Sequence, residues 1–268
     1  MNANISLGQY LPGNSVVHRL DPRTKIILMA VYIAIVFVVK TLPVFLMPVV
    51  LLVAIFAFAQ VPASYFFSAL KPMKWLLVFM FVINLFATQG DTVWFEWKFI
   101  RLTQEAAEQA VFMTLRLVLL VAGTSVLTLT TSPIALTDGL EKLMSPLRKL
   151  RFPAHELAMM MTIALRFIPT LMEETDRIQK AQMARGADFE SGNIFQRAKS
   201  MIPVLVPLFV SAFRRADELA LAMESRCYHG GEGRTRMREL HFHACDLIAT
   251  LLLVAFMTGI IVLEKLPL

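Results

Sequence analysis

Long apolar segments separated by short polar ones run through most of this 268-residue chain. The first, residues 26–59, is almost continuously apolar, although a helix of that length would greatly exceed the ~30 Å hydrocarbon core of a bilayer. A lysine and a proline near its middle therefore predict a helical hairpin of two short spans, about 25–40 and 44–60. Asp21 followed by Pro22 combines an N-cap acceptor with a residue that is tolerated in the first turn, which predicts a helix starting at residue 22.

Three further apolar segments predict membrane spans at about 73–88, 110–130 and 244–263. The segment 89–109 between two of them carries tryptophans and mixed charges, which are typical of a membrane interface. Arg116 lies inside the span at 110–130, where a charge must either snorkel to the interface or bind an internal partner. Because a long arginine side chain can reach the interface, we expect snorkelling.

Residues 132–243 are helical in pattern but carry too many charges to cross a membrane. Two long helices are expected there, at 153–185 and 194–226, and the apolar run in each is shorter than the ~20 residues of a span. We expect both helices to pack at the inner surface of the membrane. The sequence thus predicts an all-α integral membrane protein with about five transmembrane helices, divided into an N-terminal transmembrane domain of about four spans (1–131), a cytoplasmic domain of long amphipathic helices (132–243) and a C-terminal transmembrane helix (244–268).

The composition supports a membrane location, because 57% of the residues are hydrophobic and only 17% are charged. Soluble domains have roughly 45–50% and about 25%, respectively. The lipid bilayer is therefore an expected partner. The net charge of +6 does not indicate nucleic-acid binding, since 16 of the 26 Lys and Arg residues fall between Ser132 and His243. This asymmetry follows the positive-inside rule and predicts a multi-pass protein with a cytoplasmic N-terminus.

The two long helices end in the same pattern. Matching residues recur at a constant offset of 41 positions: Asp176, Ile178, Ala181, Ala184, Arg185 and Gly186 in the first helix, and Asp217, Leu219, Ala222, Ser225, Arg226 and Cys227 in the second. A simple C-cap explains one such arginine, because the helix dipole favours a cation at the C-terminus. Two matched sites instead indicate that the chain grips two related partners, or one partner twice, through paired hydrogen bonds from arginine to carboxylates.

Other kinds of chemistry have weaker support in the sequence. No Gly-x-x-x-x-Gly-Lys-Ser/Thr loop is present, so the chain is not expected to hydrolyse ATP alone. Glu173-Glu174 with Arg177 resembles the Glu-Glu-x-x-x-Arg motif of an intramembrane protease, but the arginine comes one residue early. Cys227 and the histidines near it match no metal-site spacing, so no metal is expected. An intramembrane hydrolase and a self-contained secondary transporter are the alternative functions.

The chain resembles the transmembrane component of energy-coupling factor (ECF) transporters, which import vitamins and metal ions into prokaryotic cells. The residues that carry the resemblance are 8–13 (Gly-Gln-Tyr-Leu-Pro-Gly), 18–25 (His-Arg-Leu-Asp-Pro-Arg-Thr-Lys) and the two arginine motifs at 184–186 and 225–227. The resemblance implies a non-enzymatic coupling subunit in the plasma membrane, whose cytoplasmic domain contains two coupling helices. In that family, each coupling helix ends in a small-Arg-small motif that enters a groove of one of two homologous ATPase subunits.

By this resemblance, Arg185 and Arg226 each contact one ATPase subunit. The small residues that flank them are expected to allow close approach: Ala184, Gly186, Ser225 and Cys227. The second motif departs from the usual Ala-Arg-Gly, but both of its flanking residues are small. ATP and Mg would be bound by the ATPase partners, and the chain itself would hold no cofactor.

The resemblance also implies a substrate-binding membrane subunit that recognises the transported molecule. A methionine-rich helix face at Met159, Met160 and Met161 is a candidate contact for this subunit, because methionine side chains re-pack easily. An ordinary buried core face is the alternative explanation of these three residues.

Overall fold

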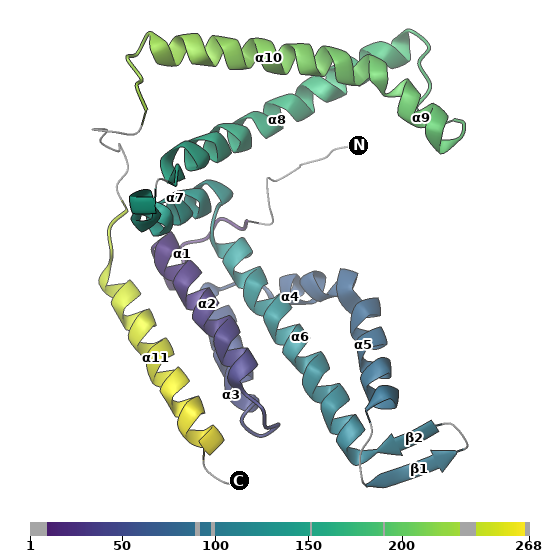
Figure 1. The fold of residues 1–268 in the computed structure, drawn as a ribbon, viewed down its shortest axis with the longest axis vertical. Coiled ribbons are helices and arrows are strands. Elements are labelled where there is room, and N and C mark those ends of the chain that lie inside the picture. Colours follow the sequence, from purple (N-terminus) through teal and green to yellow (C-terminus); the bar gives the residue numbers. More distant parts are fainter. Residues whose placement is uncertain are drawn as a thin grey trace. The chain divides into compact units, whose positions relative to one another are not determined.

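The computed structural model describes residues 10–88, 92–97, 100–150, 152–189, 191–230 and 240–265. Helices make up most of this part of the chain, which confirms the expected helical membrane-protein fold (Figure 1). Two compact units are present. Of the described residues, those within 10–142 and 240–265 form the larger unit, and those within 143–230 form the smaller unit. Gly8 and Gln9 of the N-terminal motif lie outside the described residues.

Helix α6 has the most neighbours in the larger unit (Figure 1). It contacts α2, α3, α4 and α5, and α11 packs against α2. The helices of this unit are α1 (Val16–Arg19), α2 (Pro22–Val38), α3 (Leu46–Ala59), α4 (Ala63–Leu70), α5 (Lys74–Ala87), α6 (Gln104–Thr130), α7 (Pro133–Met144) and α11 (Ala244–Lys265).

The start of α2 confirms the sequence prediction. Asp21 is the N-cap residue, its side chain accepts a hydrogen bond from the backbone N–H two residues further on, and Pro22 is the first helical residue. Apolar side chains of α2, α3, α6 and α11 then form the core, in which Tyr32 is only 3% exposed. Its hydroxyl donates to the carbonyl of Leu119 on α6 at 3.1 Å. Gly123 lies against the Tyr32 ring, so the absence of a side chain there lets α2 and α6 come close.

Four helical stretches of the described residues are long and apolar enough to cross a membrane: Ala63–Ala87, Gln104–Thr130, Ile194–Glu224 and Ala244–Glu264. The expected spans at 110–130 and 244–263 fall within two of these stretches. The first two expected spans form α2 and α3, but these helices have 17 and 14 residues, fewer than the ~20 that usually cross a bilayer. The turn between α2 and α3 is longer than the lysine and the proline in the sequence indicated.

Two of these stretches differ from the sequence prediction. Ala63–Ala87 includes α4, which was not predicted, and a 3₁₀ turn at Lys71–Met73 separates α4 from α5. Figure 1 shows that α4 and α5 run in clearly different directions on either side of this turn. Ile194–Glu224 was expected to lie outside the membrane, yet it meets the same criteria of length and composition. Its location at the inner surface therefore stays a prediction.

A β-hairpin precedes α6 and is an exception to the all-helical expectation. Strand β1 (Val93–Trp97) pairs in antiparallel fashion with β2 (Ile100–Thr103). The side chain of Thr103 then caps α6 by accepting from the backbone N–H of Ala106 at 3.2 Å. Helix α6 consequently begins at Gln104 rather than near residue 110. Aromatic and β-branched residues favour strands, and this segment contains both, but it was interpreted only as a membrane-interface segment.

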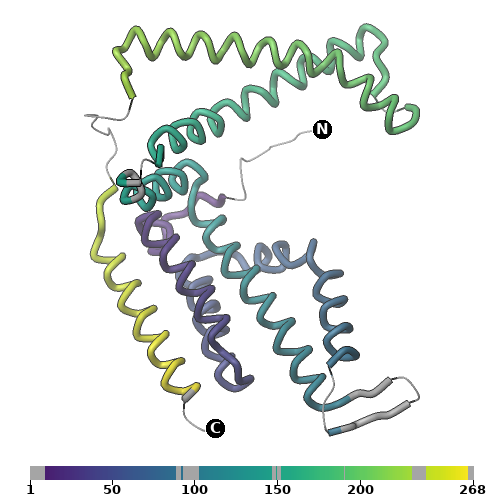
Figure 2. The backbone as a smooth tube through the Cα atoms, in the orientation of Figure 1, coloured from purple at the N-terminus to yellow at the C-terminus, as the bar shows by residue number. Residues whose placement is uncertain are grey.

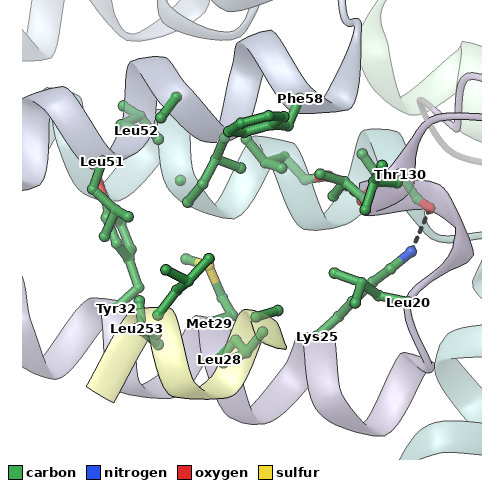
Figure 3. A pocket seen from close by; sticks show the side chains of 18 of the residues that line it. Leu20, Lys25, Leu28, Met29, Tyr32, Leu51, Leu52, Phe58, Thr130 and Leu253 are labelled. Carbon is green, nitrogen blue, oxygen red and sulfur yellow. Dashed lines mark hydrogen bonds between the residues drawn. The ribbon is translucent and has the colours of Figure 1, made fainter. Parts of the chain in front are cut away.

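An apolar cavity of about 550 Å³ lies among α2, α3, α6 and α11 of the larger unit. Figure 3 shows leucine and aromatic side chains around it, including Tyr32, Leu51 and Leu253. At one end lies Lys25, whose ammonium group donates to the backbone carbonyl of Thr130 at 2.9 Å (Figure 3). The lysine is thus directed to a helix end rather than left unpaired in the apolar cavity.

The smaller unit contains the two long helices that the sequence predicts. They are α8 (Ala154–Ala184), preceded by a 3₁₀ segment at Ser145–Leu150, and α10 (Ile202–Glu224), preceded by the short α9 (Ile194–Ser200). Figure 2 follows the backbone from α8 through the connection into α9 and α10. The expected single helix at 194–226 is therefore interrupted at Met201, two residues before Pro203, which cannot supply a backbone N–H for a continuous helix.

Candidate functional site

The first arginine motif forms the C-terminus of α8. Arg185 is the C-cap residue, and Gly186 follows with φ +88°, in the left-handed region. The N–H of Gly186 donates to the carbonyl of Met183 at 2.9 Å, and the N–H of Ala187 donates to that of Gln182 at 3.0 Å. These two bonds define a Schellman motif, in which a left-handed residue turns the chain back and satisfies the last carbonyls of the helix.

The second motif repeats this arrangement bond for bond at the end of α10. The N–H of Cys227 donates to the carbonyl of Glu224 at 2.9 Å, and the N–H of Tyr228 donates to that of Met223 at 3.0 Å. Cys227 has φ +58°, so a cysteine occupies the left-handed position that glycine holds in the first motif. Arg226 therefore has the same place relative to its turn as Arg185. The shared sequence offset corresponds to a shared backbone conformation.

All six residues of the two motifs are exposed. Within the part of the chain that the structure describes, neither the Arg185 nor the Arg226 guanidinium makes a hydrogen bond or an ion pair with another residue. An arginine whose only task was to satisfy the helix end would point its donors at the last carbonyls. Here the backbone turn already satisfies those carbonyls, so both guanidinium groups are available to a partner.

The two arginines lie at opposite ends of an antiparallel helix pair. The side chain of Gln182, near the end of α8, donates to the carbonyl of Pro203, near the start of α10, at 3.4 Å. Further back along α8, Glu174 reaches Ser211 in the middle of α10. Since α10 has 23 residues and rises about 1.5 Å per residue, its two ends are about 35 Å apart. The motifs therefore face two separate places rather than one shared pocket.

Glu174 links the two helices, a contact that the sequence analysis missed. Its Oε2 accepts a hydrogen bond from the Arg215 guanidinium at 2.7 Å, and its Oε1 accepts one from the hydroxyl of Ser211. Both bonds cross from α8 to α10 instead of joining neighbours on one helix. Both oxygens of this carboxylate are thus engaged in holding the helix pair together, which explains the residue without a hydrolytic role.

The methionine cluster is only partly buried. Met160 and Met161 are 56% and 53% exposed, whereas Met159 is half-buried. Successive residues of a helix point about 100° apart, so these three side chains do not form a single face. Met160 and Met161 nevertheless contribute to a largely apolar surface of α8, on which Leu157 and Ile168 are also exposed.

Arg116 binds an internal partner instead of snorkelling. Its guanidinium donates to the backbone carbonyl of Val39, the C-cap residue of α2, at 2.8 Å. The same group lies over the rings of Phe112 at 4.5 Å and Phe37 at 5.7 Å. The expectation of snorkelling is therefore wrong, because the end of α2 presents unsatisfied carbonyls within reach and two aromatic faces accept the cation.

Metal ligands are not gathered in the part of the chain that the structure describes. No group of three or more His, Cys, Asp or Glu side chains is placed there to hold a metal ion. Cys227 and His229 follow α10, whereas His241 and His243 precede α11 in the other unit.

Comparisons with known proteins identify the family of this chain. The family model of CbiQ, described as cobalt transport protein, matches residues 13–237. An energy-coupling factor transporter transmembrane protein EcfT of Thermosediminibacter oceani is 56% identical over 91% of this chain and 92% of its own length. The EcfT proteins of Ruminiclostridium cellulolyticum and Bacillus subtilis are 50% and 47% identical, over 98% and 95% of this chain and 98% and 97% of their own lengths. The chain therefore belongs to the CbiQ family and is a multi-pass ECF transporter transmembrane component of the EcfT type.

Proposed function

We propose that this chain is the coupling subunit of an ATP-driven importer of vitamins or other micronutrients. Arg185 and Arg226 each enter a groove of one of two homologous ATPase subunits, which bind ATP and Mg. Movement of these subunits passes through α8 and α10 to a substrate-binding membrane subunit. The chain itself catalyses no reaction and holds no cofactor.

The observation that carries this proposal is the pair of helix ends that share one backbone turn and one arginine position. Each presents an exposed arginine whose donors are unused by the described residues, and the two are separated by the length of α10. One globular partner that filled a single pocket would need the arginines close together. Two homologous partners, each with the same groove, need two copies of the same motif at a distance.

The chemistry of the motif suits a carboxylate-lined groove on each partner. A guanidinium group makes paired, charge-assisted hydrogen bonds to a carboxylate. Ala184 and Gly186 on one side, and Ser225 and Cys227 on the other, are small enough for a second backbone to come close. Removal of one partner of such a buried charge pair typically costs about 2–5 kcal/mol of binding free energy.

An exposed apolar surface supports a second membrane partner. On α10, Phe209 is 61% and Phe213 is 69% exposed, and on α8, Met160 and Met161 are also exposed. Surfaces of this kind on one chain are typical of contacts with another protein or with lipid. We assign Met159, Met160 and Met161 to the contact with the substrate-binding subunit, where flexible methionines accommodate its movement.

The distribution of basic residues supports a cytoplasmic N-terminus. Sixteen of the 26 Lys and Arg residues lie between Ser132 and His243, and the positive-inside rule places such segments in the cytoplasm. This orientation puts both arginine motifs on the side where ATP is available. The protein is accordingly assigned to the prokaryotic plasma membrane.

The test is co-purification with tagged ATPase subunits, followed by ATP-driven uptake of a radiolabelled vitamin in liposomes that also contain its binding subunit. Arg185→Ala and Arg226→Ala should each weaken the complex, and the double variant should lose the ATPase subunits and uptake. Arg214→Ala is the matched control, because Arg214 is an exposed arginine of α10 outside the motif. Normal assembly and uptake in the double variant would refute the proposal. Uptake or peptide hydrolysis by the chain alone would instead support one of the alternative functions.

A further inference from the structure

The segment 18–25 contains charged side chains that are buried in the larger unit. Asp21 is 4% exposed and Lys25 is 6% exposed, and both lie at the start of α2. Asp246, at the start of α11, is 3% exposed. Buried charges are expensive unless they are paired and hydrogen-bonded, so each of these groups requires a structural explanation.

Lys25 binds the end of α6, from which the chain continues through α7 to the smaller unit. Its ammonium group donates to the carbonyl of Thr130 at 2.9 Å, to the hydroxyl of Thr131 at 3.3 Å and to the carbonyl of His18 at 3.3 Å. These bonds use all three donors of the ammonium group. Thr130 is the last residue of α6, and the chain passes into the smaller unit through α7. The cation thus lies at the negative end of the α6 dipole, where it is stabilising.

Helix α7 also packs directly on the start of α2. Gly139 lies so close to Pro22 that a Cβ atom at this position would meet the Pro22 Cβ at 3.0 Å and its backbone carbon at 3.3 Å. A larger residue at this position would therefore crowd Pro22 and require one of the two helices to shift. Helix α7 therefore packs against residues 18–25, the same segment that binds the end of α6.

Asp246 binds the segment through which the chain returns to the larger unit before α11. One carboxylate oxygen accepts from the backbone N–H of His243, the residue before α11, at 2.8 Å. The other accepts from the backbone N–H of Asp21, the N-cap residue of α2, also at 2.8 Å. A single carboxylate therefore caps two helices that are far apart in sequence, and both of its oxygens act as acceptors.

Arg23 adds a second bond to the returning chain. Its guanidinium donates to the carbonyl of Leu240 at 3.3 Å and lies over the Phe242 ring at 5.3 Å. Leu240 and Phe242 precede α11 and follow the second arginine motif in sequence. The exit after α6 and the return before α11, which flank residues 143–238, are thus both bound to residues 18–25.

We propose that residues 18–25 form a coupling clamp, which makes the two connections to residues 143–238 move together with α2. This proposal rests on the proposed function, because it assigns the clamp to the transmission of movement from α8 and α10 into the membrane helices. Without it, a displacement of the smaller unit would pull the ends of α6 and α11 apart instead of moving the larger unit as one body. Lys25, Arg23 and Asp246 are then positioning residues of the transport cycle.

The other end of α11 provides a matched control. There Glu264 also accepts two hydrogen bonds, from the backbone N–H of Lys40 at 3.1 Å and from the hydroxyl of Thr41 at 3.3 Å. This carboxylate joins α11 to the turn that follows α2, at the end away from both connections. Glu264→Gln therefore removes a carboxylate acceptor at the opposite end of α11, where the bonds are exposed, without touching the clamp.

The experiment compares Asp246→Asn, Lys25→Met and Glu264→Gln in the full transporter reconstituted in liposomes. Asparagine keeps the shape of Asp246 but replaces one acceptor by a donor, which faces a backbone N–H. For each variant, subunit stoichiometry, ATP hydrolysis and uptake of a radiolabelled vitamin are measured. We expect both clamp variants to assemble and hydrolyse ATP, while uptake per ATP falls about tenfold or more. Glu264→Gln should behave as the wild type, because it leaves the clamp intact. A general loss of stability in a clamp variant would differ from uncoupling, since it would lower hydrolysis and uptake together.

Unchanged uptake per ATP in both clamp variants would overturn the proposal. If either fails to assemble, Arg23→Met decides. This variant removes the bond to Leu240, the contact with the Phe242 ring and the 3.8 Å ion pair with Asp21, but it leaves the bonds of Lys25 and Asp246 in place. Normal coupling in this variant likewise overturns the clamp. Arg185→Ala/Arg226→Ala is measured in parallel. Normal assembly and uptake in this double variant would refute the proposed function itself. If the double variant instead loses the ATPase subunits while Asp246→Asn couples normally, only the clamp is refuted.

Discussion

At each of the two helix ends, the side chain of the arginine is available to a partner, whereas the residue after it is constrained by its backbone conformation. Arg185 and Arg226 were identified from the sequence because charge and small neighbours recur together. The residue after each arginine has a different constraint, since both positions are left-handed. Glycine adopts this conformation without strain. In any other residue the Cβ atom comes too close to a backbone carbonyl oxygen, which raises the conformational energy.

Exchanging these two residue types should shift local stability in opposite directions. Gly186→Ala should destabilise the end of α8 by about 1 kcal/mol, and Cys227→Gly should stabilise the end of α10 by a similar amount. No heavy atom of the described residues lies within 4 Å of a Cβ placed on Gly186, so the expected cost there comes from the backbone. Hydrogen exchange at the N–H groups of Ala187 and Tyr228 measures both effects. Slower exchange in Gly186→Ala would contradict this explanation.

At the scale of elements, helix packing in the larger unit depends on a close approach of α2 and α6. The Tyr32 ring lies directly over Gly123, and its hydroxyl reaches the carbonyl of Leu119. Small residues at helix interfaces of membrane proteins allow such contacts, because dispersion and hydrogen bonds replace the hydrophobic effect there. The periodicity of apolar residues predicted both helices, but it carried no information about this contact.

Gly123→Ala should therefore destabilise the larger unit by about 1–3 kcal/mol, because the new methyl group would overlap the Tyr32 ring. Thermal unfolding in detergent measures the change. Gly259→Ala is the control on α11, since no heavy atom of the described structure lies within 4 Å of a Cβ placed there. In a Tyr32→Leu background the cost of Gly123→Ala should largely disappear. An equal cost in both backgrounds would show that the ring is not responsible.

At the scale of the whole molecule, the orientation in the membrane follows from the summed charge of the connecting segments rather than from any one residue. Lys and Arg are concentrated between Ser132 and His243. The turn between α2 and α3, which contains Lys40 and Thr41, is expected on the opposite side of the membrane. The two cysteines, Cys227 and Cys245, are both exposed and provide natural sites for labelling.

A membrane-impermeant maleimide should test this orientation. In intact cells that carry the Cys245→Ser variant, Cys227 should stay unlabelled until the membrane is permeabilised. Thr41→Cys in a chain without the native cysteines should be labelled at once, because Thr41 is exposed in the turn between α2 and α3. Labelling is detected by a mass shift of the protein. The reverse pattern would place the N-terminus outside and would separate the arginine motifs from cytoplasmic ATP.

Local sequence was sufficient for features that depend on neighbouring residues. The start of α2 at Pro22, the approximate positions of α6, α8 and α11, and the two arginine motifs follow from caps, periodicity and a repeated pattern. The hairpin before α6 was missed because its strands have only 5 and 4 residues, and the apolar pattern of such short segments does not distinguish a strand from a helix. The lengths of α2 and α3 were missed because apolar residues do not mark where a turn ends.

The sequence by itself determined the helical membrane fold and the two exposed arginines, since both rest on chemistry within a few turns of the chain. Tertiary structure alone decided that these arginines lie at opposite ends of a helix pair, that Arg116 binds the end of α2, and that Asp246 caps a residue 225 positions away. The physical reason is that a buried polar group needs a partner of matching geometry. Which partner it finds depends on how distant helices pack, and no local pattern contains that information.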